Sequence, residues 1–290
     1  MRARMLGHAP EELTRGRLRR LGEGIGKVVY ASPHWVVKRE RSPSEILALI
    51  AIWKMARRLE KILPGRLGRN LLQHPSRQLR FLRVVMQGVV RVIPQSVWYS
   101  THAGEMWRVY RHRDERGERL AKEYLAGSDL MPEQVGFPPV RVEIGGWPGW
   151  LNVSEATERV EATLHQRLVQ LAGAGRFEEV ELWLERLLDL RKRGWRRGVF
   201  SVDAHLKNFG VTGERVVLLD AGGLSDDWAE IERRLAAEER VDKPHVALGL
   251  EAVLRERPDI AARFNARWRA TVNRDEVGRH LSAAQDSASN

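Results

Sequence analysis

One long amphipathic segment, residues Phe177–Arg193, limits most strongly what this chain can fold into. A broad apolar face along it predicts a helix packed on a core; the face is formed by Val180, Trp183, Leu184, Leu187, Leu188 and Leu190. The helix is expected to end at Arg191–Gly194, where cations meet the negative end of the helix dipole and a glycine follows. No uninterrupted apolar stretch approaches the roughly 18 residues of a membrane span, so a protein with a buried core is expected.

The sequence after this helix predicts a small β element among further helices. The expected segments are short strands at Gly198–Val202, Phe209–Val211 and Val216–Leu219, then helical structure over Asp227–Val272. Another helix is expected to begin near Ala156 and to contain Leu164, Leu168 and Leu171. The polar tail Leu281–Asn290 is expected to be disordered.

The first half predicts mostly strands around one helix. The expected elements are a β-hairpin over Leu21–Lys38, a helix opening at Ser42, a less regular helix over Ser76–Gln87, strand-like residues Val92–Tyr110 with a charged turn after them, and a hairpin over Val140–Val153. The fold class is therefore α+β with two lobes. The expected divisions are a basic arm (1–20), a β-rich lobe (21–155), a helical lobe (156–275) and a disordered tail (276–290).

Charge and cysteine content narrow the chemistry. The chain of 290 residues has no cysteine, which excludes disulfides, thiolate metal sites and cysteine nucleophiles. Its formal net charge is +11, and the segment Lys54–Arg91 holds ten basic residues against the single acid Glu60. Such a segment favours a polyanionic partner, which is nucleic acid, an anionic membrane surface or a phosphorylated substrate. The alternative is a solvated helix face rich in arginine.

Three features of the first half suggest phosphate binding. Gly22, Gly24 and Gly26 lie in one hairpin, where backbone N–H groups can approach phosphate oxygens without an intervening Cβ. Lys38 ends the apolar strand that follows, and Glu45 begins the next helix, where it could hold the Lys38 ammonium in position. Each feature also has an ordinary explanation: a tight turn, an edge lysine and an acid favoured by the helix dipole.

Polar residues at the ends of the later strands suggest metal and proton chemistry. Asp220 ends an apolar strand and is followed by Ala221-Gly222-Gly223, a setting suited to a hard cation bound through oxygen. Asn208 offers a carbonyl oxygen to the same ion, and Asp203 can accept a proton from a hydroxyl group. Singly, each residue could be a turn former or a helix cap. The ordered set of all three favours the functional interpretation.

This order of motifs resembles the protein-kinase-like superfamily, which includes protein kinases, aminoglycoside phosphotransferases and lipopolysaccharide-core sugar kinases. The resemblance spans about Leu21 to Gly223. It implies that Asp203 is the catalytic-loop aspartate, that Asn208 and Asp220 are Mg²⁺ ligands, and that Lys38, paired with Glu45, binds phosphate. It also implies that Ser154, Glu155 and Ala156 lie at the hinge that meets the adenine of ATP.

The departures from the protein-kinase pattern favour an atypical branch. The third glycine comes one residue early, Ser201-Val202 stand where protein kinases have His-Arg, and Ala221 stands where they have Phe. His205, two residues after Asp203, is similar to the Asp-x-His-x-x-Asn loop of small-molecule and sugar kinases.

The function expected from the resemblance is transfer of the ATP γ-phosphate to a hydroxyl group, with Mg²⁺ as cofactor. The acceptor expected is a sugar or anionic glycolipid, since a basic segment suits such a partner. The alternatives are a Ser/Thr protein kinase, and a pseudokinase or basic nucleic-acid-binding protein without catalysis. The expected location is the cytoplasm, with peripheral contact at the inner face of the membrane.

Overall fold

The computed structural model describes residues 4–23, 26–46, 48–49, 108–109, 111–145, 148–239 and 249–289. It has mixed α and β structure, with a β-rich N-terminal region and a helical C-terminal region, which confirms the expected class at this level. Two compact units can be distinguished. The sheet unit comprises Met5–His112 and Val135–Thr157, and the helical unit comprises Met1–Arg4, Arg113–Gln134 and Glu158–Asn290. The helical unit thus includes residues 113–134, which were expected in the first lobe.

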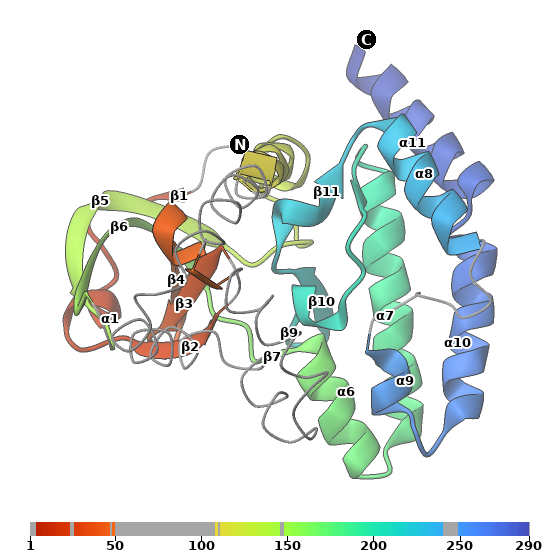
Figure 1. Ribbon diagram of the computed structural model, residues 1–290, viewed down its shortest axis with the longest axis horizontal. Coiled ribbons are helices and arrows are strands. Elements are labelled where there is room, and N and C mark those ends of the chain that lie inside the picture. The colour runs from red at the N-terminus through yellow and green to blue at the C-terminus, as the bar shows by residue number, and fades with distance from the viewer. Residues whose placement is uncertain are drawn as a thin grey trace, which may run out of the picture. The chain divides into compact units, whose positions relative to one another are not determined.

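The sheet unit is built on one six-stranded sheet (Figure 1). Its strand order is β1-β5-β6-β4-β3-β2. The strands are β1 (Arg4–Met5), β2 (Arg19–Glu23), β3 (Lys27–Ala31), β4 (Trp35–Glu40), β5 (Gln134–Glu143) and β6 (Trp150–Glu158). The predicted hairpins are confirmed, because β3 pairs antiparallel with β4 and β5 lies beside β6.

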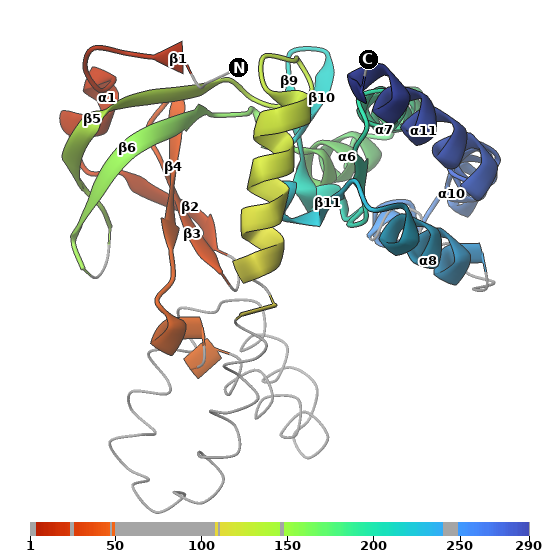
Figure 2. The ribbon, with the colours of Figure 1, turned by 90° about the horizontal axis from the view of Figure 1, so that it is seen from above.

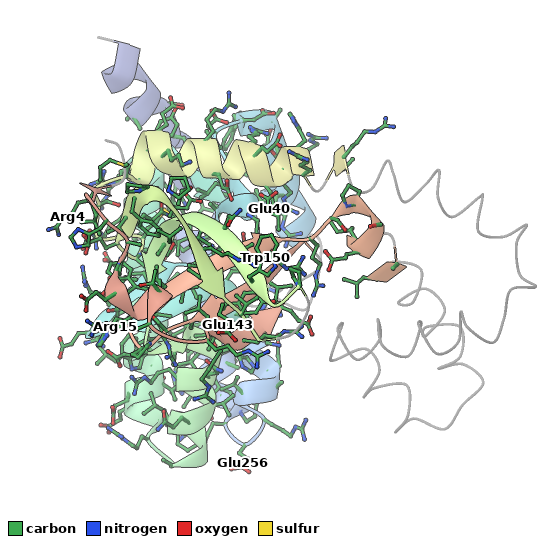
Figure 3. All side chains as sticks on the ribbon, turned by 90° about the vertical axis from the view of Figure 1, so that its left-hand side faces the viewer. Arg4, Arg15, Glu40, Glu143, Trp150 and Glu256 are labelled. Atoms are coloured by element: carbon green, nitrogen blue, oxygen red, sulfur yellow. The ribbon has the colours of Figure 1, made fainter. Side chains whose placement is uncertain are left out.

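Residues from the expected N-terminal arm help to form the core of the sheet unit. Leu13, in α1 (Glu11–Thr14), and Leu18 are buried against sheet residues such as Tyr30 and Phe137. The end of the β5–β6 hairpin, in contrast, carries exposed side chains. There the guanidinium of Arg141 lies 4.3 Å from the ring centroid of Trp150. Glu143 and Trp150, labelled in Figure 3, mark this hairpin.

The helix expected after β4 begins where the sequence predicts. Residues 43–46 and 48–49 are helical, and Ser42 with Glu45 forms a capping box: the Ser42 Oγ accepts from Glu45 N–H (3.3 Å), and Glu45 Oε2 accepts from Ser42 N–H (2.9 Å). The basic segment 54–91 and the helix expected over 76–87 lie outside the described residues.

The prediction of strand and charged turn before β5 is wrong where the structure describes the chain. Residues 108–109 and 111–120 are helical, and this helix leads into the π-helical turn η1 (Ala121–Leu125). Gly117, Leu120 and Ala121 are buried at positions i, i+3 and i+4. This spacing gives the segment one inward face despite its high charge.

The helical unit packs its helices around a core of leucine, phenylalanine and tryptophan side chains. The helices are α6 (Leu164–Gly173), α7 (Phe177–Trp195), α8 (Trp228–Glu239), α9 (Leu250–Val253), α10 (Pro258–Thr271) and α11 (Arg274–Ser289). Both α10 and α11 pack against α7, the helix that the sequence indicates most clearly (Figure 1). No helix in the described part of the chain is long and apolar enough to cross a membrane.

Two predictions, the start of one helix and the disorder of the C-terminal tail, are wrong. The helix expected near Ala156 begins at Leu164, because Thr163 and Gln166 form a capping box there while the residues up to Glu158 continue β6. The tail expected to be disordered is instead part of α11, since Val277 and Leu281 are buried on its inward face. Hydrophobic residues spaced by four anchor that helix to the core.

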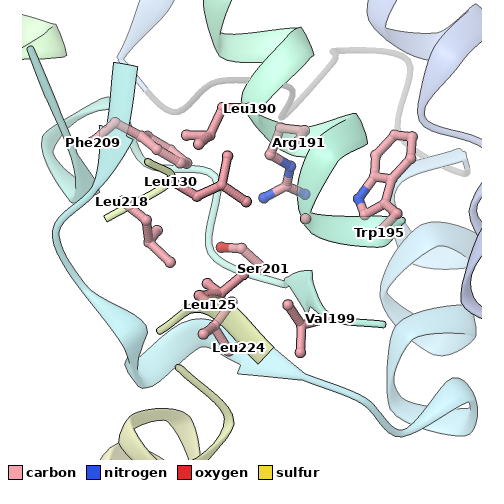
Figure 4. Close-up of a pocket in the computed structure, with 11 residues that line it drawn as sticks. Leu125, Leu130, Leu190, Arg191, Trp195, Val199, Ser201, Phe209, Leu218 and Leu224 are labelled. Atoms are coloured by element: carbon pink, nitrogen blue, oxygen red, sulfur yellow. The ribbon is translucent and has the colours of Figure 1, made fainter. Parts of the chain in front are cut away.

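Arg191, expected among the cations at the end of α7, points into the core. Its side chain is nearly fully buried, with the guanidinium 4.5 Å from the ring centroid of Phe200 and 5.4 Å from that of Trp268. Figure 4 shows the guanidinium directed into a small cavity of about 30 Å³, which Leu130 and Ser201 also line. The surrounding rings offset part of the cost of burying this charge.

Candidate functional site

A β-hairpin in the helical unit brings Asn208 and Asp220 to the same place. Strands β9 (Phe209–Thr212) and β10 (Arg215–Leu218) pair antiparallel, with Phe209 opposite Leu218. Asn208 directly precedes β9, and Asp220 follows β10 after one residue. The backbone N–H of Leu219 donates to the Asn208 carbonyl oxygen at 2.8 Å, which extends the pairing beyond the strands. The first residue before β9 and the first residues after β10 must therefore lie side by side.

A second short strand pair places Asp203 beside the loop that follows Asp220. Strand β8 (Phe200–Ser201) pairs antiparallel with β11 (Leu224–Ser225), and the Val202 N–H donates to the Gly223 carbonyl at 2.7 Å. Asp203 is the next residue. The structure therefore brings Asp203, Asn208 and Asp220 near one loop, because the β9–β10 hairpin and the separate β8–β11 strand pair meet there.

The backbone around Asp203 and Asp220 fixes one oxygen of each carboxylate. Asp203 Oδ1 accepts from the His205 N–H (3.2 Å), and Asp220 Oδ1 accepts from the Gly222 N–H (3.0 Å), which caps the 3₁₀ turn η3 (Ala221–Gly223). Among the described residues, no further hydrogen bond to either carboxylate is present. Asp203 and Asn208 are half-buried and Asp220 is exposed. Their remaining oxygens are thus open to a ligand.

His205, grouped with the catalytic residues by the resemblance, forms a hydrogen bond within its own loop. Its Nδ1 accepts from the Lys207 N–H (3.2 Å), capping the 3₁₀ turn η2 (Leu206–Asn208). Burial, with the nearby charge of Lys207, lowers the pKa of His205. Burial and the same lysine also lower the pKa of His165 in the first turn of α6, which packs against η2. The neutral imidazole is therefore favoured at both positions.

The oxygen donors at this site suit Mg²⁺ carried by a nucleotide. In the described ranges, no three His, Asp or Glu side chains converge as a protein-only metal cage. Mg²⁺ commonly binds through one or two protein carboxylates together with substrate phosphates and water. Asp220 and the Asn208 amide oxygen would supply the protein part of such a set, so a cation is expected to bind well only with the phosphates present.

Side chains from other parts of the chain lie close to Gly222 and Gly223, the two glycines of the loop after Asp220. A Cβ at Gly222 would lie 2.5 Å from Asp114 Oδ1 and 3.2 Å from Asp220 Oδ1. A Cβ at Gly223 would lie 2.9 Å from the Cβ of Asp203. At Gly222 the close atom is the end of a flexible side chain, which can move, whereas at Gly223 the Cβ and backbone N of Asp203 cannot easily give way, so packing favours glycine most strongly at Gly223.

Helix 111–120 packs closely against this loop at Gly117. A Cβ at Gly117 would lie 2.0 Å from the Ala221 carbonyl oxygen and 2.9 Å from Gly222 Cα. Figure 2 shows the yellow helix running close to β11, which follows this loop. Because the neighbouring atoms are backbone, the position of the helix and the position of the Asp220 loop are coupled.

Arg116 joins the same helix to the segment after the loop. Its Nη1 donates to Glu230 Oε2 (2.9 Å), and its Nη2 donates to Asp226 Oδ1 (2.8 Å) and to the buried Ser225 Oγ (3.3 Å). The Asp226 carboxylate raises the pKa of Arg116. Charge-assisted hydrogen bonds of this kind are stronger than neutral ones and fix direction as well as distance.

Two of the residues expected to bind phosphate, Gly22 and Lys38, lie in one row across three strands of the sheet unit. Val29 on β3 lies opposite Gly22 on β2 and opposite Lys38 on β4. Residues directly opposite one another share a face of the sheet. Lys38 is exposed, whereas Val28 and Val37 are buried on the other face. No atom of the described residues would lie within 4 Å of a Cβ at Gly22. Gly24 lies outside the described residues, and Gly26 accepts from the Arg41 N–H (2.8 Å).

The prediction that Glu45 pairs with Lys38 is corrected by the structure, which pairs Glu45 with Arg39. Arg39 Nη1 and Nη2 donate to the two Glu45 oxygens, each at 2.9 Å. Successive residues of a strand point to opposite faces, so the helix that carries Glu45 meets Arg39 rather than Lys38. The bidentate pair lowers the pKa of Glu45 and raises that of Arg39.

The strand before Ser154, Glu155 and Ala156, expected to end at Val153, is longer than predicted. All three residues lie inside β6, which continues to Glu158, and Ala156 is buried in the sheet core. The chain leaves the sheet after Glu158. The contact of these three residues with adenine stays a prediction.

The sequence interpretation missed helix 111–120, which supplies Arg113, Asp114 and Gly117 to the site. Gly117 within a charged run resembled a turn, yet the spacing of Gly117, Leu120 and Ala121 was the available signal for a helix.

The chain matches no model of a known protein family, and no curated protein matches it at a significant level. The function must therefore be argued from the site itself.

Proposed function

We propose that this protein is an ATP-dependent phosphotransferase with a protein-kinase-like fold. The observation that supports the proposal most directly is that Asp203, Asn208 and Asp220 lie at the ends of two short antiparallel strand pairs, β9–β10 and β8–β11. The sequence resemblance assigns these same residues to the acceptor base and to the two protein ligands of Mg²⁺. Their spacing along the chain is not one that ordinary turn formation requires.

The reaction follows from the roles of these side chains. The acceptor hydroxyl oxygen forms a bond to the γ-phosphorus of ATP, the bond from that phosphorus to the β,γ-bridging oxygen breaks, and ADP leaves. Asp203 orients the hydroxyl group and takes its proton. Asn208 and Asp220 would hold Mg²⁺, and the bound ion would supply positive charge next to the phosphate oxygens. Most of the rate enhancement comes from positioning and electrostatics, because the protein makes no covalent intermediate.

The sheet unit is proposed to bind the nucleotide phosphates with Lys38. The glycine at position 22 and the exposed Lys38 in the same row suit this role, because glycine lets phosphate approach the backbone while the ammonium supplies charge. Arg39 and Glu45 then have a structural role, tying the next helix to β4 from the opposite face.

The acceptor is proposed to be a sugar or an anionic glycolipid. The support is the charge of Lys54–Arg91, which favours a phosphorylated or membrane-associated substrate over a cationic one. Contact with an anionic membrane surface is part of the same proposal.

The test is turnover of γ-labelled ATP by the full chain and by three variants. Asp203→Asn and Asp220→Asn should each reduce phosphate transfer or release at least 100-fold, because each removes a group that acts on the reacting atoms. Asp189→Asn, an exposed aspartate on α7, is the matched control and should retain wild-type turnover. Wild-type turnover in Asp220→Asn would show that the metal ligands are wrongly assigned.

A further inference from the structure

Arg113 lies at the same glycine as Asp203. A Cβ at Gly223 would lie 2.9 Å from Asp203 Cβ and 3.6 Å from Arg113 Nη2. One residue earlier, a Cβ at Gly222 would have Asp114 and Asp220 as its neighbours. Helix 111–120 therefore presents a guanidinium toward the proposed base and a carboxylate toward the proposed metal ligand.

The position of Arg113 is fixed by its helix rather than by its own contacts. Gly117 and Arg116 hold the helix to the Asp220 loop and to the segment after it, as described above. Arg113 is exposed and makes no hydrogen bond or ion pair with another residue that the structure describes. Its five N–H donors are thus available to a ligand at Gly223.

The proposed reaction places negative charge beside Asp203. The γ-phosphoryl group carries charge on its non-bridging oxygens throughout the transfer, and the Asp203 carboxylate must approach it to take the acceptor proton. Two anions in contact repel each other, so a cation near both groups lowers the barrier. A guanidinium suits this position because its planar fork can donate to two phosphate oxygens and does not lose its charge.

We infer that Arg113 is a further catalytic residue, which donates hydrogen bonds to the non-bridging oxygens of the transferred phosphoryl group. The inference rests on the proposed function. Arg113 transfers no proton: it binds the γ-phosphoryl oxygens more strongly as charge develops on them. The residue is outside the set that the sequence resemblance assigns.

The experiment compares Arg113→Gln with Arg119→Gln, a matched change at an exposed arginine on the same helix. Turnover of γ-labelled ATP is measured, and thermal stabilisation is measured with Mg-ADP alone and with Mg-ADP plus aluminium fluoride, a mimic of the phosphoryl group in transfer. Arg113→Gln should lower kcat about 100-fold or more. The rise in Tm caused by Mg-ADP should be the same as in wild type, and the additional rise caused by aluminium fluoride should be lost. Arg119→Gln should behave as wild type in every measurement.

The outcomes separate this inference from the proposed function. Absence of ATP turnover and of a Mg-ADP shift in the wild-type chain would overturn both. If the wild type is active and Arg113→Gln matches Arg119→Gln, the inference is wrong and the proposed function stands. An equal loss of the Mg-ADP shift and of turnover would also contradict the inference, because Arg113 would then act on nucleotide binding or on the fold. Arg113→Lys should restore part of the turnover, since it keeps the charge without the fork.

Discussion

Replacement of Gly117 by alanine tests the coupling between helix 111–120 and the Asp220 loop. The added methyl group would lie 2.0 Å from the Ala221 carbonyl oxygen, 2.6 Å from the Ala221 carbonyl carbon and 2.9 Å from Gly222 Cα. All three atoms belong to the backbone, so no side-chain rotation can relieve the contact. Either the helix must move away or the loop that follows Asp220 must be displaced.

Two opposing effects set the magnitude. Alanine in place of glycine stabilises a helix interior by about 1 kcal/mol. Forcing a methyl group into a packed site costs about 1–3 kcal/mol, and backbone contacts of this shortness place Gly117 at or above the upper end of that range. A net loss of about 2 kcal/mol in the free energy of unfolding is expected, which corresponds to a fall in Tm of roughly 4–8 °C.

The assay is thermal unfolding of Gly117→Ala with and without Mg-ATP. Besides the lower Tm, the variant should bind Mg-ATP about tenfold more weakly, a loss of about 1.4 kcal/mol, because the displaced backbone follows Asp220 directly. Gly173→Ala in α6 is the control. A Cβ at Gly173 would meet no atom of the described part of the chain within 4 Å, so that variant should have a Tm equal to or above that of wild type.

A Tm for Gly117→Ala at or above the wild-type value, with unchanged Mg-ATP affinity, would refute the reasoning. It would show that the helix does not pack on the Ala221 backbone, and the assignment of Arg113 and Asp114 to the site would lose its basis.

Two further predictions concern charge. Burial and Lys207 lower the pKa values of His165 and His205 in the folded protein. Near the usual histidine pKa of about 6.5, the unfolded chain therefore binds more protons than the folded protein. Stability should fall on acidification through that range. His165→Gln should flatten this decline in urea unfolding between pH 7.5 and 5, and an unchanged slope would contradict the assignment. Glu45→Gln should reduce stability at pH 7 by about 1–2 kcal/mol, since it leaves the largely buried Arg39 guanidinium without its bidentate partner. This difference should vanish as pH falls through the lowered pKa of Glu45, below 4.5, and a difference that persists there would show that the ion pair is not its source.

Sequence patterns predicted those parts of the fold that depend on local signals. The apolar face of α7, the β3–β4 hairpin and the short strands β8 to β10 were all recognisable, because periodicity and turn residues act over few positions. The Ser42 cap likewise identified the start of a helix. These elements also place Asn208 and Asp220 together, once β9 and β10 are paired.

Features decided by tertiary contact could not be predicted in the same way. The side of β4 that meets the next helix determines that Glu45 pairs with Arg39, and this follows only from the alternation of the strand against a packed core. Helix 111–120 was missed because Gly117 is present for close packing rather than for a turn. The tail was mistaken for disorder because the burial of Val277 and Leu281 depends on the helices that they contact.

Calorimetric titration of ATP into the full chain, in Mg²⁺ and in EDTA, tests the central claim most directly. If Asp220 and Asn208 hold Mg²⁺ together with the nucleotide phosphates, wild-type binding should require Mg²⁺, and Asp220→Asn should lose the Mg²⁺-dependent part. Binding of equal strength with and without Mg²⁺ in both proteins, or no binding of ATP at all, would contradict the account.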